Sequence, residues 1–300
     1  MPTDLGGLDM TRPLRPSTAV PVFTLALLLS VLTAPALAEG TRSSRASERV
    51  GTVAHRGASE RAPENTLASI RKTIRADSDY VGIDVRRTRN DKLVLVHDKT
   101  LDRTTNVEKV YPRRDPWRVS QFSLREIRRL DAGNWWSSSY SGARVPSLAD
   151  ALRSLDKSRT GAFLEVKDPR AGTGRLVHRA IRRYTGWLRP GQRDRLVVQS
   201  FNRRWVRTYH RKHPGVQTSV LGDVAPGGMH RYSWADQVNM PYGDVLRRPR
   251  LVRAAHRHGL EVAVHTVNGR RTMRKVVRKG VDAVSTDRPG RLNDVLESSG

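Results

Sequence analysis

The chain has 300 residues, of which 37% are hydrophobic and 28% charged, and it contains no cysteine. This length allows one large domain or two small ones, with enough apolar side chains to bury a core. Disulfides, thiolate nucleophiles, cysteine-ligated zinc sites and iron–sulfur clusters are excluded. The formal charge of +26 predicts attraction to anionic partners, but 46 Arg against 9 Lys is also what GC-rich coding alone would produce.

Residues 1–38 are predicted to be a signal peptide, with Met10 as an alternative start. Basic residues precede an apolar run over 20–32, and Ala-Leu-Ala at 36–38 supplies the small-x-small pattern of a cleavage site. The alternative is an uncleaved membrane anchor, for which the apolar run is short. We therefore expect a secreted, extracellular protein.

Short apolar runs alternate with amphipathic stretches from residue 50 onward, after a polar linker over 39–50. This alternation is typical of strand–helix units, and eight such units in about 250 residues fit a (β/α)8 TIM barrel, an α/β fold. We therefore assign residues 51–300 to one barrel domain. The expected strands are 52–54, 80–85, 163–166, 196–200, 217–221, 237–240, 262–266 and 283–286, and the expected helices are 65–76, 175–184, 203–212, 251–258, 269–278 and 289–296.

A ninth apolar run ends at His97 and follows the second strand after only five residues. That gap is too short for a helix, so we predict a β-hairpin that places Asp84 and His97 roughly opposite each other. Residues 99–146 then form an insertion that we expect to be a small subdomain. Its adjacent Trp135 and Trp136 either line the substrate mouth or, as we favour, form the core of the insertion.

Reactive side chains collect at the predicted carboxyl ends of the strands, which is where TIM barrels place their active sites. Carboxylates suit a hard divalent cation, and that cation and basic side chains can hold a phosphoryl group. Two histidines can divide base and acid roles in a displacement at phosphorus. A single strand-end His or Asp is more often structural, but several at aligned ends indicate a site. The candidates are His55, Arg56, Asp84, His97, Glu165, Lys167 and Phe201.

Two stretches resemble the glycerophosphodiester phosphodiesterase family of TIM-barrel phosphodiesterases, and with its predicted leader we expect this chain to be a secreted bacterial type. They are Val-Ala-His-Arg-Gly-Ala at 53–58 with Ala-Pro-Glu-Asn-Thr-Leu-Ala at 62–68, and Val-Leu-Val-His-Asp-Lys-Thr-Leu-Asp-Arg-Thr-Thr-Asn at 94–106. The resemblance covers residues 51–297. It implies hydrolysis of glycerophosphodiesters to glycerol 3-phosphate and an alcohol. The related phospholipase D toxins share the barrel and the histidines, but the second stretch favours the phosphodiesterase branch.

By this resemblance, His55 and His97 are the catalytic acid/base pair, and Arg56 contacts the phosphate. Lys167 lies close to the phosphate, and we place Phe201 at the substrate as well. The supporting residues, which we expect to orient Arg56 or the first turn of the following helix, are Glu64 and Asn65.

The resemblance also implies one divalent cation, calcium or magnesium, bound by Asp84 and Glu165. The family usually has Glu-x-Asp on its second strand, with both acids on the metal, whereas this chain has Gly82 at the first position. Residues two apart on a strand face the same side, so a ligand is lost from the site itself. This loss should weaken a hard-cation site unless Glu64 or Asp98 compensates.

His265 stands where the family often has Trp, either as a packing replacement or as a third imidazole in the site. The first functional hypothesis is a secreted, metal-assisted phosphodiesterase. Its substrate would be a small glycerophosphodiester or a glycerol-phosphate polymer such as teichoic acid, with peripheral contact to an anionic cell surface. The alternative is a weakened or inactive barrel that binds phosphodiester or cell-wall polymer. No motif for specific nucleic-acid recognition is present.

Overall fold

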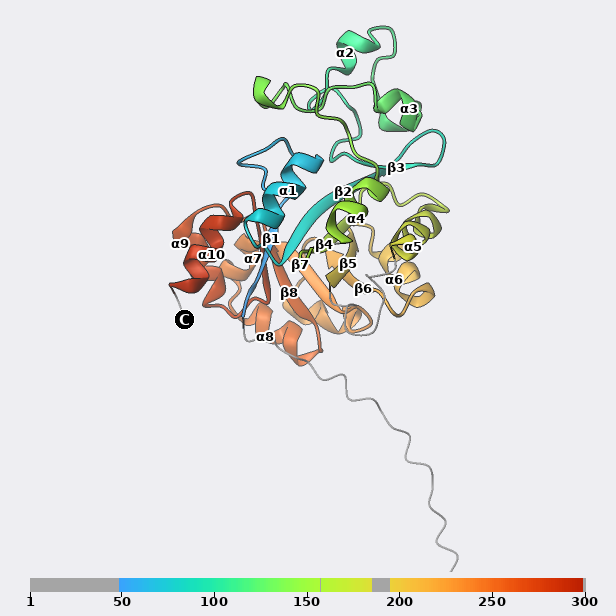
Figure 1. Cartoon of the computed structure of the whole chain (residues 1–300). Helices are drawn as coiled ribbons and strands as arrows, with labels where there is room; N and C mark the ends of the chain where they lie inside the picture. Colours follow the sequence, from blue (N-terminus) through green and yellow to red (C-terminus); the bar gives the residue numbers. More distant parts are fainter. Residues whose placement is uncertain (1–48, 157, 185–194, 299–300) are drawn as a thin grey trace, which may run out of the picture. The chain divides into compact units, whose positions relative to one another are not determined.

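The computed structural model describes residues 49–156, 158–184 and 195–298. The predicted signal peptide and most of the predicted linker lie outside these residues. No helix in the described ranges is long and apolar enough to cross a membrane. The described chain forms a closed barrel of eight parallel strands surrounded by helices, which confirms the predicted α/β barrel (Figure 1).

The barrel closes because β1 pairs in parallel with both its sequence neighbour β2 and the last strand, β9. Most of these strands are short apolar runs with few charges, as expected for a sheet covered on both faces. The strands, in order around the barrel, are β1 (Gly51–Ala54), β2 (Tyr80–Arg87), β4 (Gly161–Val166), β5 (Leu196–Ser200), β6 (Gln217–Leu221), β7 (Gln237–Pro241), β8 (Glu261–His265) and β9 (Ala283–Thr286).

Amphipathic helices pack their apolar faces against the outside of the barrel. Helices α4 and α7 were not predicted, and α1 begins two residues later than predicted. Thr66 caps α1 by accepting a hydrogen bond from the backbone N–H of Ser69, and Asn65 has a positive φ of 54° that a helix cannot continue. The helices are α1 (Leu67–Arg75), α4 (Leu148–Asp156), α5 (Thr173–Arg183), α6 (Arg203–Lys212), α7 (Tyr242–Arg247), α8 (Arg250–Arg257), α9 (Arg270–Val277) and α10 (Pro289–Glu297).

The barrel interior has an apolar layer beneath a polar one. The apolar layer is filled by small and aromatic side chains, with the ring of Tyr80 edge-on to that of Phe163 at 4.9 Å between centroids. Alternate residues of a strand face the same side, so the next inward position lies two residues further along each strand. The apolar layer holds Val53, Phe163, Val197, Ala263 and Ala283. Two residues beyond them are His55, Glu165, Gln199, His265 and Ser285.

The predicted hairpin is present as β3 (Leu93–Leu95), which runs antiparallel to β2 with Val85 opposite Leu95. Continuing this register puts Asp84 opposite Val96, one residue short of the predicted His97. After β3 the chain leaves the barrel for a lobe that carries the short helices α2 (Val107–Val110) and α3 (Leu124–Ile127), as Figure 1 shows. The lobe has its own apolar cluster, which includes Leu101, Val107, Phe122, Ile127 and Leu130.

Candidate active site

His55 follows β1 and is held by Asp287, the first residue after β9. The His55 Nδ1 atom lies 2.8 Å from an Asp287 carboxylate oxygen. Asp287 also accepts hydrogen bonds from the Ser59 hydroxyl at 2.9 Å and the Asn268 amide at 2.7 Å. Burial raises the pKa of Asp287, but the bond to His55 and the other hydrogen bonds outweigh it and lower the pKa to about 2. With Nδ1 engaged, His55 keeps Nε2 for chemistry.

His97 follows β3 and is held by its neighbour. Its Nδ1 lies 2.7 Å from the Asp98 carboxylate, which also forms an ion pair with Arg103 from the inserted lobe. The His97 carbonyl accepts two hydrogen bonds from the Arg86 guanidinium, at 2.7 and 3.0 Å. Burial lowers the pKa of His97, and this effect outweighs the carboxylate charge of Asp84, which would raise it. The neutral imidazole is therefore favoured.

Arg56 sits in a left-handed turn immediately after His55, with φ 57°, and Gly57 follows at φ 86°. A Cβ at residue 57 would lie only 2.4 Å from the Ser69 hydroxyl, so the turn requires glycine. The turn points the Arg56 guanidinium at Glu64, with Nη1 3.0 Å from Oε1, and places Nε 3.6 Å from Asp84.

Glu64 is also bound by Arg103, which donates to Oε1 at 2.7 Å and to Oε2 at 2.9 Å. Burial raises the pKa of Glu64, but Arg103 and Arg56 outweigh it and the pKa lies below its ordinary value. Asp98 is likewise paired with Arg103, so both residues proposed to replace a missing metal ligand are already engaged by guanidinium groups.

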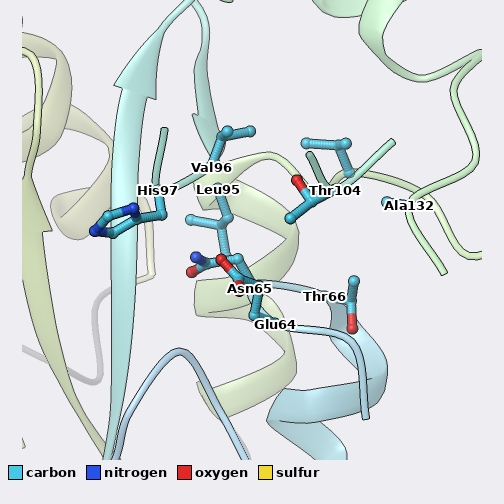
Figure 2. Close-up of a pocket in the computed structure, with 9 residues that line it drawn as sticks. Glu64, Asn65, Thr66, Leu95, Val96, His97, Thr104 and Ala132 are labelled. Carbon is cyan, nitrogen blue, oxygen red and sulfur yellow. The ribbon is translucent and has the colours of Figure 1, made fainter. Parts of the chain in front are cut away.

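The Asn65 side chain orients Asp84, while the Asn65 backbone N–H donates to the Arg56 carbonyl at 2.9 Å. Its side-chain amide donates to the Asp84 carboxylate at 2.8 Å, and its carbonyl accepts from the Asp84 backbone N–H at 3.1 Å. Figure 2 shows Glu64 and Asn65 side by side in the loop before α1, with Thr66 at the start of the helix. The loop therefore supports both the guanidinium of Arg56 and the buried carboxylate on β2.

Asp84 and Glu165 are paired residues of β2 and β4, and Lys167 lies between their carboxylates. The Lys167 Nζ atom is 2.7 Å from Glu165 and 3.5 Å from Asp84. Burial opposes ionisation of Asp84, but Lys167 and Arg56 lower its pKa, whereas burial and the Asp84 charge raise the pKa of Glu165. Lys167 Nζ also lies 5.8 Å from the ring centroid of Phe201, which is 57% exposed.

The two carboxylates fit a divalent cation held by few protein ligands. One Glu165 oxygen is buried and, among the described residues, is contacted by the Lys167 ammonium at 2.7 Å; carboxylate oxygens are the ligands that hard cations prefer. A Cβ at Gly82 would meet nothing closer than 3.5 Å, so the position is open to a side chain that this chain lacks. The described residues contain no group of three His, Cys, Asp or Glu arranged for a metal. Asp84 and Glu165 would therefore depend on water to complete the coordination, as magnesium sites often do.

A pocket of about 500 Å³ opens beside His55 and Arg56. Trp135 and Trp136 line it, and Trp135 is 41% exposed. The favoured prediction that the two tryptophans form the core of the insertion is therefore wrong, because aliphatic side chains and Phe122 fill that core instead. The other lining residues are Ser59, Glu60, Glu64, Asn268, Asp287 and Arg288.

The two histidines act electrostatically on the same cluster. His55 lowers the pKa of Glu165, and His97 lowers that of Asp84. His97 lies beside Glu64 and Asn65 at a void of about 10 Å³, and Figure 2 shows its ring directed away from Thr104 and Ala132. The site thus combines two carboxylate-bound imidazoles with buried cations, a set suited to acid/base chemistry on an anion.

Sequence reasoning missed the residues that hold the histidines. Asp287 directly follows the last strand, in Thr-Asp-Arg-Pro, and that position was a detectable signal. Asp98 was noted only as a substitute metal ligand, although it adjoins His97. No local pattern predicts the contact of Arg103 with Glu64 or that of Asn268 with Asp287, because these partners lie 39 and 19 residues apart.

Comparisons with known proteins converge on one family. Residues 55–291 match the family described as "Glycerophosphoryl diester phosphodiesterase family". The chain is 28% identical over 254 residues to a glycerophosphodiester phosphodiesterase of Caldanaerobacter subterraneus, covering 83% of this chain and 98% of that protein. It is 30% identical over 243 residues to Bacillus subtilis YhdW, covering 79% and 94%. The crystal structure of an Agrobacterium tumefaciens glycerophosphodiester phosphodiesterase matches with a TM-score of 0.68 at 28% identity, covering 82% and 99%.

Proposed function

Because the chain belongs to the glycerophosphoryl diester phosphodiesterase family and is a phosphoric diester hydrolase, we propose that it cleaves glycerophosphodiesters by acid/base chemistry at two histidines. The products are glycerol 3-phosphate and an alcohol. The observation that carries this proposal is the pair of imidazoles, each bound through Nδ1 to an aspartate. His55 shares the interior layer of Glu165, and His97 lies beside Asn65, which binds Asp84.

The side chains of this chain supply each part of the reaction. Arg56 and Lys167 neutralise the phosphate charge. One histidine takes a proton at Nε2 from the nucleophile, and the other donates a proton from Nε2 to the oxygen of the leaving alcohol. The nucleophile is water or the neighbouring glycerol hydroxyl, and the hydroxyl route forms a cyclic phosphate first. Asp287 and Asp98 hold the rings and stabilise the charge that develops on them.

Family members generally depend on a divalent cation. In this chain Asp84 and Glu165 would hold it, and calcium or magnesium would fit their oxygen ligands. When bound, the cation adds positive charge beside the phosphate oxygens. We propose that it binds weakly, because Gly82 provides no third carboxylate.

An assay of the mature chain on glycerophosphocholine, with calcium or magnesium titrated in and a chelator as control, tests the proposal. We expect release of glycerol 3-phosphate that rises with cation concentration and falls on chelation. Absence of release at every cation concentration would contradict it. A parallel assay on a glycerol-phosphate polymer asks whether the chain also attacks polymeric substrate.

Gly82 favours a second candidate, a barrel that binds phosphodiester or cell-wall polymer without turnover. Gly82→Glu separates the two functions, and Gly82→Gln controls for the added volume. If the chain is an enzyme, Gly82→Glu should lower the dissociation constant of the cation, measured by calorimetry, by roughly tenfold or more. It should also raise activity at low cation concentration. A pure binder would show no hydrolysis before or after the change.

We further propose that the protein acts outside the cell. The support is the predicted leader over residues 1–38 with its cleavage pattern. There the formal charge of +26 would attract anionic headgroups, glycerol-phosphate polymer or an anionic cell surface. N-terminal sequencing of the exported protein checks this, with Glu39 as the expected first residue.

A further inference from the structure

Three polar side chains of the barrel interior form a hydrogen-bonded chain that the proposed mechanism does not use. Gln199 on β5, Asn239 on β7 and His265 on β8 supply it. The Asn239 amide lies 2.9 Å from the Gln199 carbonyl oxygen, and its own carbonyl lies 2.8 Å from His265 Nδ1. Gln199 and Asn239 are almost fully buried, at 7% and 3% exposure, so their orientation is fixed by these contacts.

The direction of these hydrogen bonds fixes the tautomer of His265. Asn239 donates through Nδ2, so its carbonyl oxygen must accept the proton of His265 Nδ1. His265 Nε2 therefore carries a lone pair. Burial is the main cause that lowers the pKa of His265 to about 4, and the nearby Lys167 ammonium acts in the same direction, so the ring is neutral near pH 7.

Two polar groups of these three residues are not used in the hydrogen bonds between them. In the described part of the structure, His265 Nε2 and the Gln199 amide nitrogen have no protein partner, and neither is an enclosed atom. One is an acceptor and the other a donor. Both belong to the interior layer that holds Glu165, whose partner in the β4–β5 register is Gln199.

A neutral acceptor does not suit a phosphate oxygen, which brings lone pairs of its own. It suits a hydroxyl, which can donate to Nε2, while a second hydroxyl can accept from the Gln199 amide. His265 belongs to the same interior layer as His55 and Glu165, so it lies beside the region proposed to hold the phosphate. The glycerol group of the substrate carries two hydroxyls next to its phosphate.

We propose that His265, held by Asn239 and Gln199, is a specificity-determining residue that accepts a hydrogen bond from a glycerol hydroxyl of the substrate. This inference rests on the proposed function for the identity of the ligand. It gives His265 a role in recognition instead of one in packing or proton transfer.

The inference is tested by measuring the affinities of glycerol 3-phosphate and propyl phosphate by calorimetry. Propyl phosphate has the same carbon chain without hydroxyls. The full mature chain should prefer glycerol 3-phosphate. His265→Phe keeps an aromatic ring but removes the acceptor, and we expect the preference to fall about tenfold. Binding of propyl phosphate should change little. His265→Gln, which retains an acceptor, should keep most of the preference.

The exposed His258, at the end of α8, offers a matched control. His258→Phe should leave the preference unchanged. An equal preference in the wild type and His265→Phe, whether or not both ligands bind more weakly, would overturn the inference. Binding requires no turnover, so a chain without hydrolase activity could still show the predicted preference, and the two proposals fail separately.

Discussion

The two histidines of the site are supported in opposite ways. His55 is bound by Asp287, which lies 232 residues later and reaches it only because β9 pairs with β1. His97 is bound by the next residue, Asp98, which a lobe residue, Arg103, holds in turn. The first pair belongs to the seam where the barrel closes, and the second to the hairpin and the inserted lobe.

This difference shows which part of the fold each proton transfer depends on. Asp287 contacts three side chains from two segments, the loop after β1 and the loop after β8, so the pair of His55 and Asp287 is held in place once the barrel is closed. Asp98 relies on Arg103, which also binds Glu64 and so connects the lobe to Arg56. A change in the lobe should therefore reach His97 and Arg56 while sparing His55.

Removing either imidazole should have the largest effect. His55→Ala and His97→Ala should each reduce release of glycerol 3-phosphate from glycerophosphocholine by roughly 10²–10⁴-fold, as expected for loss of a general acid or base. His258→Ala on the surface is the matched control and should retain activity. Full activity in both active-site variants would refute the assignment.

Asp287→Asn tests the support of His55 separately from that of His97. It keeps the size of the side chain but removes the charge that stabilises an imidazolium at His55, so we expect kcat to fall about 10–100-fold with KM nearly unchanged. The matched change on the hairpin is Asp98→Asn. An unaltered kcat in Asp287→Asn would mean that His55 is not oriented by this carboxylate.

Arg103→Met should reduce activity less, and it should act on His97 and Arg56 but not on His55. Loss of its bonds to Glu64 and Asp98 should reduce kcat/KM by about tenfold, since methionine keeps the apolar stem but not the charge. Combined with Asp98→Asn the losses should be less than additive, because both act through His97. Full additivity in this double-mutant cycle would contradict the shared route.

The smallest effect concerns stability in acid. The pKa of Asp287 is lowered from 3.8 to about 2, so its ionised form stabilises the fold above pH 4 and this contribution is lost as the pH falls toward 2. Urea unfolding should therefore show a stability difference between wild type and Asp287→Asn at pH 5 that shrinks by pH 2. At Asp294, an exposed surface position, the same substitution should change stability by less than about 0.5 kcal/mol at either pH. If the stability difference between wild type and Asp287→Asn were the same at pH 5 and pH 2, ionisation of Asp287 would not stabilise the fold.

The strands could be predicted because each is a short apolar run with turn residues on both sides, and their carboxyl ends then located the reactive side chains. Helix α4 was missed because it directly follows the long insertion, although Leu148, Leu152 and Leu155 form its buried stripe. The contact of Arg103 with Glu64 could not be predicted, because the two residues lie 39 positions apart and meet only in the folded protein.

The substitution at Gly82 was visible in the sequence, but its consequence was not. Only the structure shows that Glu64 and Asp98, the two possible substitutes, are already bound by arginines. It also shows Lys167 between the remaining carboxylates. The balance among these charges depends on burial and distance.

Division of proton transfer between the two rings is tested most directly with a substrate whose leaving group needs no proton. The comparison is between glycerophosphocholine and p-nitrophenyl glycerophosphate in the His55→Ala and His97→Ala variants. Nitrophenolate departs without acid assistance, so the variant lacking the acid should recover most of its rate and the variant lacking the base should not. Recovery of both variants, or of neither, would contradict two imidazoles with separate roles on one phosphate.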